Sequence, residues 1–257
     1  MHILMLKNRT TPLDPYLEIM EENGNSAEFL PLLHHAPVNV ASTTAYLSSN
    51  EFLDEISTFI ITSQRAVEVF HECLGQIEQK NSKTAERIRS KTGYTVGPAT
   101  EKILLDNGFL DVRGGSQAGN GSKLADIITN DLKDSALPIV FFTGVIRRDV
   151  ILVKLKANGF DVKEEVIYKT EPRSGILDDF HKCCQKHIDW IVFFSPQGTQ
   201  EIVDHMKKSL QSRQLRIACI GPTTEEYLKS NGISPAVVAG KPTASSLFAG
   251  FLDHGHE

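Results

Sequence analysis

Two five-residue stretches of this chain have almost the same sequence, VGPAT at residues 96–100 and IGPTT at residues 220–224. Each follows a short apolar run and precedes a helix-like run. Glycine permits a tight turn there, and proline at the first helical position loses no useful N–H. The amides that follow are unpaired donors at the positive end of a helix dipole, and Thr100, Thr223 and Thr224 add hydroxyl groups. Both stretches therefore predict a binding site for an anion.

Ser63 and Ser195 occupy a second pair of equivalent positions, because FIITSQRAVEVF at 59–70 resembles IVFFSPQGTQEIV at 191–203. Both serines stand where the N-cap of a helix is expected, and Pro196 supports this position for Ser195. The simpler alternative is that these serines and threonines only cap and pack helices. Four such corners in a repeat, all at strand-to-helix junctions, favour ligand binding.

Cationic side chains directly follow several predicted strand ends, where a bound anion would need them. They are Lys7, Arg9, Arg65 and the adjacent pair Arg147 and Arg148. Neighbouring residues on a helix point about 100° apart, so the sequence leaves open which of the two adjacent arginines faces the ligand. Tyr168 lies in the stretch EEVIYKTEP, where its phenol either reaches a ligand or stays hydrogen-bonded in a hinge.

Several common chemistries lack their sequence signatures. No GxGxxG follows a strand and no GK[ST] of a P-loop occurs, so RGGSQAGNGSK at 113–123 is interpreted as a mobile loop with Ser122 capping the next helix. No His, Cys and carboxylate set has metal-ligand spacing, and the four cysteines indicate buried or half-buried thiols in a reducing compartment. What remains is a cofactor-free, metal-free site of hydroxyls, amides and cations that binds a polyanion.

The composition limits the class of protein. A chain of 257 residues with 40% hydrophobic and 23% charged residues is typical of a globular protein. Its net charge of −5 argues against broad nucleic-acid binding. The longest apolar stretches are too short to span a membrane, and MHILMLKNR lacks the features of a signal peptide. We therefore expect a cytoplasmic protein that binds neither nucleic acid nor membranes.

Short apolar runs alternate with amphipathic stretches along the chain. The runs HILML, TFIIT, YTVG, PIVFFT, DWIVFF and RIACIG predict strands, and their near-continuous apolar character suits a parallel sheet covered on both faces. Four of the intervening helices end in Asn-Gly, at residues 23–24, 107–108, 158–159 and 231–232, which predicts left-handed C-terminal caps. This alternation predicts a doubly wound α/β fold.

The repeat extends beyond these corners, because HILMLKNR near the start also resembles IVFFTGVIRR at 139–148. If each domain needs one strand of each type, the central domain is continuous and the other is assembled from both ends of the chain. The expected domains are 1–33 plus 174–257 and 38–168, with linkers at 34–37 and 169–173. The chain would then pass from one domain to the other twice, and such an arrangement implies a cleft between the domains with a hinge.

A family resemblance adds to this interpretation and covers nearly the whole chain. It rests on FIITSQRAV, TVGPAT, FFTG with RRDVILVKL, VIYKT, VFFSPQGTQEIV, ACIGPTT and GKPTASSLFAG, which occur in this order. Together these motifs resemble the uroporphyrinogen-III synthase family of tetrapyrrole biosynthesis. Gln197 and Thr199 depart slightly from the family's pattern.

The resemblance implies two flavodoxin-like α/β domains joined by a two-stranded linker, and a cytosolic, cofactor-free lyase. The implied reaction cyclises hydroxymethylbilane, a linear tetrapyrrole with eight carboxylates, to uroporphyrinogen III with inversion of the terminal ring and loss of water. Tyr168 is expected to donate a proton to the departing hydroxyl group. The family positions expected to bind substrate map onto Ser63, Thr100, Ser195, Thr223 and Thr224, with Arg65 and Arg148 as carboxylate partners.

Two other classes of protein compete with this hypothesis. A two-lobed α/β receptor for a small anionic ligand has the same fold and no chemistry. A nucleotide-sugar transferase also has two such domains, but no nucleotide fingerprint occurs here. We expect a monomer that makes at most a transient contact with the preceding enzyme of the pathway.

Overall fold

The computed structural model describes residues 1–10, 13–209 and 215–254, without the side chain of residue 209. The chain forms two compact units: unit 1 comprises Met1–His34 and Glu171–Glu257, and unit 2 comprises His35–Thr170. The sequence-based domain boundaries were 1–33 plus 174–257 and 38–168. Within the described residues, none of the helices combines the length and apolar composition needed to cross a bilayer.

Unit 1 contains a five-stranded parallel sheet in the order β11-β10-β9-β1-β2. Numbered along the chain within this unit, the order is 2-1-3-4-5, which is the flavodoxin order. Its elements are β1 (His2–Leu6), α1 (Pro15–Glu22), β2 (Ser26–Phe29), α8 (Ile176–Cys184), β9 (Trp190–Phe193), α9 (Gln200–Ser209), β10 (Arg216–Ile220), α10 (Gly221–Ser230), β11 (Val237–Ala239) and α11 (Ala244–Asp253).

Unit 2 is built around a sheet in the order β3-β8-β7-β4-β5-β6, in which β4 to β8 are parallel. Its elements are β3 (Leu33–Pro37), α2 (Val40–Leu47), a π-helical turn (Glu51–Glu55), β4 (Thr58–Ile61), α3 (Gln64–Lys80), α4 (Ser82–Arg89), β5 (Thr92–Val96), α5 (Pro98–Asp106), β6 (Asp111–Gly115), α6 (Gly121–Asp131), β7 (Ile139–Gly144), α7 (Val150–Ala157) and β8 (Val162–Pro172).

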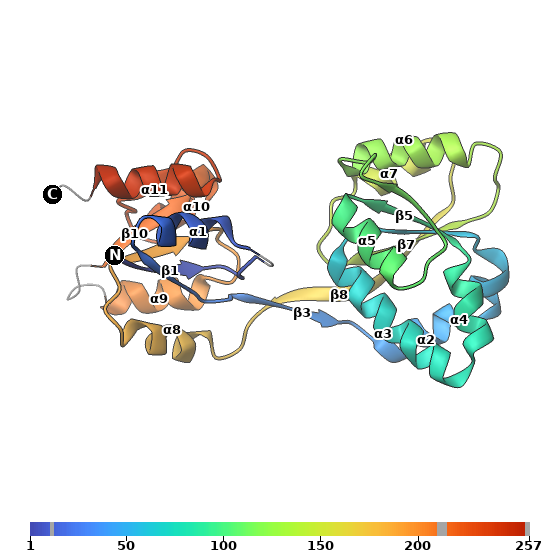
Figure 1. Cartoon of the computed structure of the whole chain (residues 1–257), viewed down its shortest axis with the longest axis horizontal. Coiled ribbons are helices and arrows are strands. Elements are labelled where there is room, and N and C mark those ends of the chain that lie inside the picture. Colours follow the sequence, from blue (N-terminus) through green and yellow to red (C-terminus); the bar gives the residue numbers. More distant parts are fainter. Residues whose placement is uncertain (11–12, 210–214, 255–257) are drawn as a thin grey trace. The chain divides into compact units, whose positions relative to one another are not determined.

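The chain passes between the two units in β3 and β8, which are neighbours in the sheet (Figure 1). They run in opposite directions, since the N–H of Val38 donates to the carbonyl of Ile167 at 3.0 Å, and the side chains of His35 and Thr170 hydrogen-bond at 2.9 Å between Nδ1 and Oγ1. The two crossings are therefore strands that hydrogen-bond to each other.

The two sheets repeat one another strand for strand. The order β6-β5-β4-β7-β8 in unit 2 corresponds to β11-β10-β9-β1-β2 in unit 1. The pairs β4 with β9, β5 with β10, and β7 with β1 are those that the sequence repeat predicted. The units differ by a circular permutation, because the counterparts of β7 and β8 come first in unit 1. The predicted α/β class with parallel sheets is confirmed.

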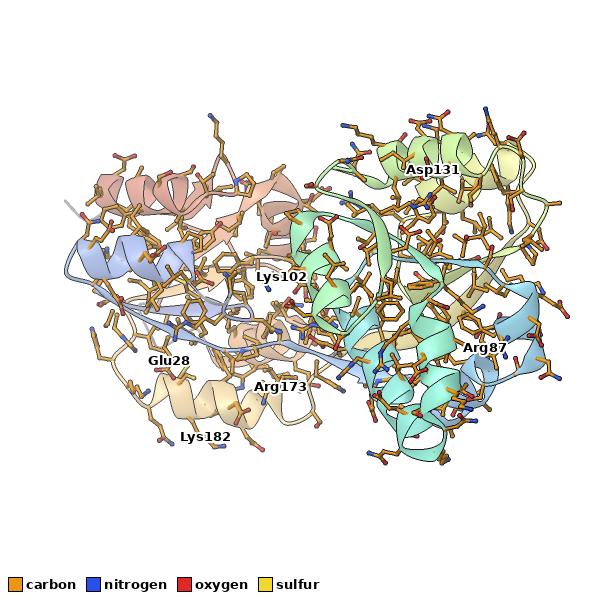
Figure 2. All side chains as sticks on the ribbon, turned by 45° about the vertical axis from the view of Figure 1, so that its right-hand side comes forward. Glu28, Arg87, Lys102, Asp131, Arg173 and Lys182 are labelled. Atoms are coloured by element: carbon orange, nitrogen blue, oxygen red, sulfur yellow. The ribbon has the colours of Figure 1, made fainter. Side chains whose placement is uncertain are left out.

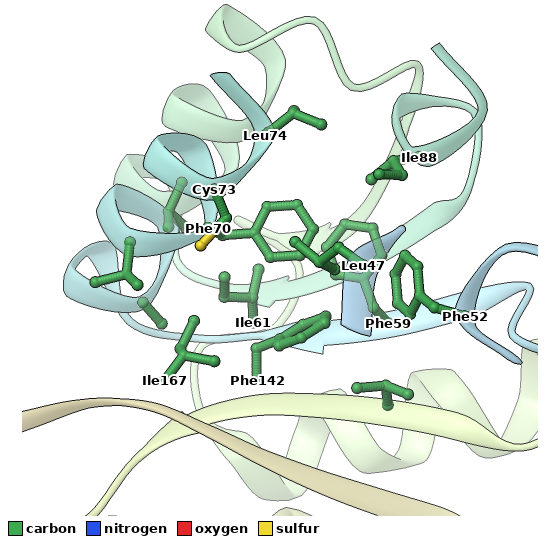
Figure 3. Close-up of a cluster of buried hydrophobic side chains, with 14 of the residues drawn as sticks. Leu47, Phe52, Phe59, Ile61, Phe70, Cys73, Leu74, Ile88, Phe142 and Ile167 are labelled. Carbon is green, nitrogen blue, oxygen red and sulfur yellow. The ribbon is translucent and has the colours of Figure 1, made fainter. Parts of the chain in front are cut away.

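Each sheet is covered on both faces, as a doubly wound fold requires. In unit 2 one face packs against α2 to α5 and the other against α6 and α7. In unit 1 one face packs against α8, α9 and α10 and the other against α1 and α11. Figure 3 shows the larger core of unit 2, where the rings of Phe59, Phe70 and Phe142 meet at centroid distances of 4.9 to 6.2 Å. These apolar faces explain why the strands have continuous apolar sequences.

The charged side chains at the surface contribute much less to stability than these cores. Arg87 of α4 and Lys182 of α8 project outward (Figure 2) and form exposed ion pairs of 2.6 Å with Asp54 and 3.0 Å with Asp179. Exposed pairs of this kind contribute about 0–1 kcal/mol each. The sequence prediction of buried or half-buried thiols is confirmed for all four cysteines.

The four predicted Asn-Gly helix ends are confirmed. Each asparagine is the C-cap of its helix. The following glycine has a φ of 70° in α1, 84° in α5, 85° in α7 and 77° in α10, a region that side chains disfavour.

Gly93 in β5 is expected to tolerate no side chain, because a Cβ there would lie 2.7 Å from Cζ of Phe59. We expect Gly93→Ala to destabilise the protein by about 1–3 kcal/mol through overpacking. Gly75 lies within α3, and a Cβ there would meet nothing within 4 Å, so Gly75→Ala should stabilise by about 0.5–1 kcal/mol. Urea unfolding followed by circular dichroism compares the two variants. Equal stability of both would contradict this packing.

Candidate functional site

The candidate site in unit 2 is a pocket of about 380 Å³ where β4 and β7 end. From β4 the chain continues to β5 and β6 on one side, whereas from β7 it continues to β8 on the other. Ligands of open α/β sheets bind at such a switch point, beyond the carboxyl ends of the strands. The pocket brings together three predicted site residues, Ser63, Arg148 and Tyr168, and its apolar lining includes Phe141 and Phe142.

Ser63 stands at the N-cap of α3, as predicted, with extended backbone angles of −121° and 132°. Its hydroxyl makes no capping hydrogen bond, and no other partner occurs among the described residues. By contrast, Asn39, Asn81 and Asn120 each accept a hydrogen bond from their own helix. The first N–H to find a helical acceptor is that of Val67, which donates to Ser63 O at 3.1 Å. The Ser63 hydroxyl and the α3 amides before Val67 therefore have no acceptor within the helix and can donate to a ligand in the pocket.

Tyr168 reaches the pocket because of an irregularity between β7 and β8. Thr143 pairs with Val166, but Gly144 pairs with Tyr168, so the register skips Ile167. The phenol ring then lies directly over Gly144: a Cβ at that position would be 2.6 Å from Cζ and 2.9 Å from Oη of Tyr168. The Oη atom has no hydrogen-bond partner in the described part of the chain. A hydrogen-bonded hinge residue, the alternative left open by the sequence, does not fit this geometry.

The structure separates the roles of the adjacent arginines, although both line the pocket. Arg147 forms ion pairs with Glu164 at 2.5 Å and with Asp149 at 3.7 Å. Arg148 is exposed and forms no ion pair with the residues that the structure describes. Its charge is therefore available to an incoming anion, whereas that of Arg147 is already balanced.

Arg65 lies beside a smaller pocket of about 170 Å³, which Tyr168 also lines. Its guanidinium pairs with Glu68 one turn along α3, with 2.8 Å between Nη1 and Oε1. This exposed pair is weak, so a carboxylate ligand can replace Glu68 at little cost.

The two Gly-Pro-x-Thr corners have the predicted local geometry. Gly97, with φ of 82°, is the N-cap of α5, and Gly221, with φ of 74°, begins α10. Thr100 and Thr224 occupy equivalent positions and are 5% and 2% exposed, whereas Thr223 is exposed. No hydroxyl of the three has a hydrogen-bond partner within the described ranges. Thr100 lines neither pocket of unit 2 described above.

Ser195 differs from the prediction, because it is not the N-cap of a helix. The chain turns through Pro196–Thr199, with the N–H of Thr199 donating to Pro196 O at 3.3 Å, and α9 begins only at Gln200. Gly198 in this turn has φ of 77°, and a Cβ there would meet Leu33 Cδ2 at 2.8 Å. The extra turn packs against the start of β3, and Ser195 is exposed.

The stretch 113–123 also differs from the prediction of a mobile loop. It begins in β6 and ends in α6, and the N-cap of α6 is Asn120 rather than Ser122. The side chain of Asn120 accepts from Lys123 N at 3.0 Å, and the Ser122 hydroxyl instead accepts from Lys154 at 3.1 Å. Gly119, Asn120 and Gly121 line the pocket. The sequence did not predict these three residues as part of the site. The preference of asparagine for N-caps was the available signal.

Lys7 of unit 1 is not available to a ligand in the way the sequence suggested. Its ammonium lies 2.5 Å from Oδ2 of Asp14, which is 1% exposed, and 5.0 to 5.6 Å from the ring centroids of Tyr16, Phe29 and Phe194. Burial raises the pKa of Asp14, but hydrogen bonds from Lys7 and from backbone amides outweigh it and hold this pKa below its ordinary value.

Replacing Asp14 with asparagine is expected to destabilise the protein by about 3 kcal/mol at pH 7, because Lys7 loses its buried partner. A depressed pKa contributes stability above the unfolded-state value of about 4, and this contribution disappears as the pH falls through the native value. The difference between the proteins should therefore shrink toward pH 3. Urea unfolding followed by the fluorescence of Trp190, the single tryptophan, measures it. Asp106→Asn, in an exposed pair with Lys102, is the control; an undiminished difference at pH 3 would contradict the role of Asp14.

These features define a class of protein: a doubly wound α/β protein with open helix N-termini and hydroxyls at the carboxyl ends of its strands. Within the described residues, no group of three or more His, Cys, Asp or Glu side chains is arranged to hold a metal ion.

Comparison with known proteins identifies the family. A family model described as uroporphyrinogen-III synthase HemD matches residues 14–249. The uroporphyrinogen-III synthase of Saccharomyces cerevisiae is 41% identical over 95% of this chain and 93% of its own length. That of Schizosaccharomyces pombe is 32% identical over 99% of this chain and 97% of its own length. The chain therefore belongs to the uroporphyrinogen-III synthase family, whose members are cofactor-independent cyclising lyases.

A solved structure supports the fold. The crystal structure of uroporphyrinogen-III synthetase from Helicobacter pylori has a TM-score of 0.56 and 18% sequence identity, covering 98% of this chain and 99% of that one. Family membership over nearly the full length favours an enzyme over the two-lobed receptor that the sequence analysis left as an alternative.

Proposed function

We propose that this protein converts hydroxymethylbilane to uroporphyrinogen III and water, as a uroporphyrinogen-III synthase. The observation that carries the proposal is the 41% identity to the yeast enzyme over nearly the whole of both chains. The pocket of unit 2 supports it, because its hydroxyls, its amides and an arginine without an ion pair among the described residues are groups that bind an anionic substrate.

The first step breaks the bond between carbon and oxygen in the terminal hydroxymethyl group. The pyrrole nitrogen of the same ring supplies the electrons, the electron pair of the bond goes to oxygen, and a proton on that oxygen makes water. We assign the proton donor as the phenol of Tyr168, whose hydroxyl has no competing hydrogen-bond partner among the described residues. The substrate supplies most of the driving force, so the phenol assists an intrinsically easy step.

The cation that remains is attacked by the substituted carbon of the last ring, which gives a spiro intermediate. The bond that joined this carbon to the methylene bridge of the preceding ring then breaks, and that methylene carbon bonds to the unsubstituted carbon of the inverted ring. The proton lost from this carbon balances the proton used to form water. Unassisted closure joins the other carbon and gives the unrearranged isomer. The enzyme must therefore hold the chain of rings in one arrangement, and positioning is its main catalytic contribution.

We assign the binding of the substrate carboxylates to helix N-termini in both units. In unit 2 the proposed groups are Ser63, Arg65, Thr100 and Arg148. In unit 1 they are Ser195, Thr223 and Thr224. Helix N-termini favour carboxylates through their unpaired amides and the helix dipole. Ser63, Thr100 and Thr224 support this assignment best, because their hydroxyls lie at the first turns of helices and are unpaired within the described residues.

The activity is tested by adding the purified protein to freshly generated hydroxymethylbilane and identifying the porphyrin isomers after oxidation. We expect isomer III to form faster than the spontaneous product. Isomer I alone, at the spontaneous rate, would show that the proposal is wrong.

The location and assembly of the enzyme are also proposals. We propose that it acts as a monomer in the cytoplasm and meets the preceding pathway enzyme only transiently. Light scattering after size-exclusion chromatography tests the first part: a mass near 28.5 kDa is expected, and twice that mass would contradict it.

A further inference from the structure

The segment after β7 and the first residue of α7 place aliphatic side chains in solvent at the edge of the pocket. Ile146 is 66% exposed and Val150 is 44% exposed, and both line the pocket of unit 2. Val145, next to Ile146, is 53% exposed. Single exposed aliphatic residues are common, but here they continue the apolar lining formed inside the pocket by Phe141, which is 3% exposed. The apolar wall of the pocket therefore extends outward beyond the buried core.

This wall adjoins polar groups of the same pocket. Arg148 follows Ile146 after one residue, and the Ser63 hydroxyl and Tyr168 lie among the same lining residues. A ligand that matches this pattern has a flat apolar body with negatively charged arms. The pyrrole rings of the proposed substrate have this character, with carboxylates attached through methylene groups.

The carboxylates alone cannot fix the orientation of such a ring. Each arm rotates about single bonds, so anchoring its end to an arginine or a helix N-terminus leaves the ring free to turn. A contact with the face of the ring removes this freedom. The ring that attacks must approach the carbon that loses the hydroxyl group, and Tyr168 is proposed to protonate that hydroxyl group. The attacking ring therefore lies in the pocket with Tyr168.

We propose that Ile146, together with Val150, packs against the face of the attacking ring and determines which of its carbons closes the macrocycle. Ile146 is thus a specificity-determining residue for isomer III. This inference rests on the proposed function. It predicts that loss of the wall changes the ratio of the two isomers more than it changes the affinity, which the charged groups provide.

The experiment is a single turnover with enzyme in excess over hydroxymethylbilane, so that spontaneous closure of free substrate does not contribute. We expect Ile146→Ser to lower the ratio of isomer III to isomer I roughly tenfold, the effect of losing one aliphatic contact with the bound ring. The enzyme concentration that gives half the maximal rate should change little. Val150→Ser should act in the same direction. Ile146→Leu, which keeps the apolar contact, should preserve the ratio of the wild-type protein.

Val153 provides the matched control. It is 64% exposed, almost as much as Ile146, and lies on α7 outside the pocket. Val153→Ser should leave the isomer ratio unchanged. If Ile146→Ser gives the isomer ratio of the wild-type protein, or if Val153→Ser shifts it equally, the inference is overturned. Failure of the wild-type protein to make isomer III would instead overturn the proposed function.

Discussion

Replacing Gly144 with alanine is expected to lower kcat roughly tenfold, although the substitution adds only one methyl group. The added carbon would lie 2.6 Å from Cζ and 2.9 Å from Oη of Tyr168. The ring must move, because the backbone of β7 is held between β4 and β8. The phenol then no longer stands where it is proposed to protonate the departing hydroxyl group.

Gly119→Ala is the matched control for this prediction. Gly119 lines the same pocket, but a Cβ there would meet nothing within 4 Å. This substitution should leave kcat within about twofold of the wild-type value, because no neighbouring group moves.

Tyr168→Phe separates an effect on catalysis from an effect on packing. This variant should lower kcat roughly tenfold without abolishing turnover, because it removes the proton donor and keeps the ring. Gly144→Ala should then have little further effect on kcat in the Tyr168→Phe background, since no hydroxyl remains to be displaced. Its effect on thermal stability should be the same in both backgrounds, because the ring is present in both. If the double variant lost kcat by the product of the two single effects, the role assigned to Tyr168 would be contradicted. Full activity of Tyr168→Phe would contradict it as well.

Ser63→Asp is expected to lower kcat/KM about 150-fold while the protein remains at least as stable. A carboxylate at this N-cap would stand close to a bound carboxylate, and two like charges about 5 Å apart repel by roughly 3 kcal/mol near a protein surface. Aspartate is at the same time a favourable N-cap, and Ser63 itself makes no capping hydrogen bond. Loss of activity therefore cannot be attributed to unfolding.

Ser63→Ala is the companion variant, because it removes the hydroxyl and leaves the amides of α3 and their dipole. We expect it to reduce kcat/KM by about tenfold, close to the lower end of the range for one hydrogen bond to a charged group. Kinetics and thermal unfolding of both variants give the comparison. If Ser63→Asp binds and turns over substrate as well as Ser63→Ala does, the N-terminus of α3 does not bind a carboxylate.

Several features could be predicted from the sequence because they depend on local rules. The apolar runs around Phe59 and Ile191 predict strands that are buried on both faces, and both residues are 0% exposed. Glycine after asparagine at 108 and 232 ends a helix because it adopts a backbone conformation that side chains disfavour. The repeat predicts equivalent strands because similar apolar runs followed by similar turn residues form similar local structure.

Other features of the site required the tertiary structure. The helix after Ser195 begins five residues later because Gly198 packs against Leu33, which lies far away in the sequence. Asn120 joins the pocket because α6 begins beside the start of α7, where the Cβ of any larger residue at Gly121 would meet Ile151 at 2.9 Å. Neither contact has a signature in the local sequence.

Charge is the clearest example of this division. The sequence by itself determined the α/β class, the repeated helix N-termini and the presence of arginines after strands. Only the tertiary structure decided that Glu164 neutralises Arg147 and that Asp14 pairs with Lys7. It also decided that Arg148 has no ion pair among the described residues. The reason is physical: local sequence fixes which groups exist and the conformation of each turn, whereas the availability of a charge depends on neighbours that the fold brings from elsewhere in the chain.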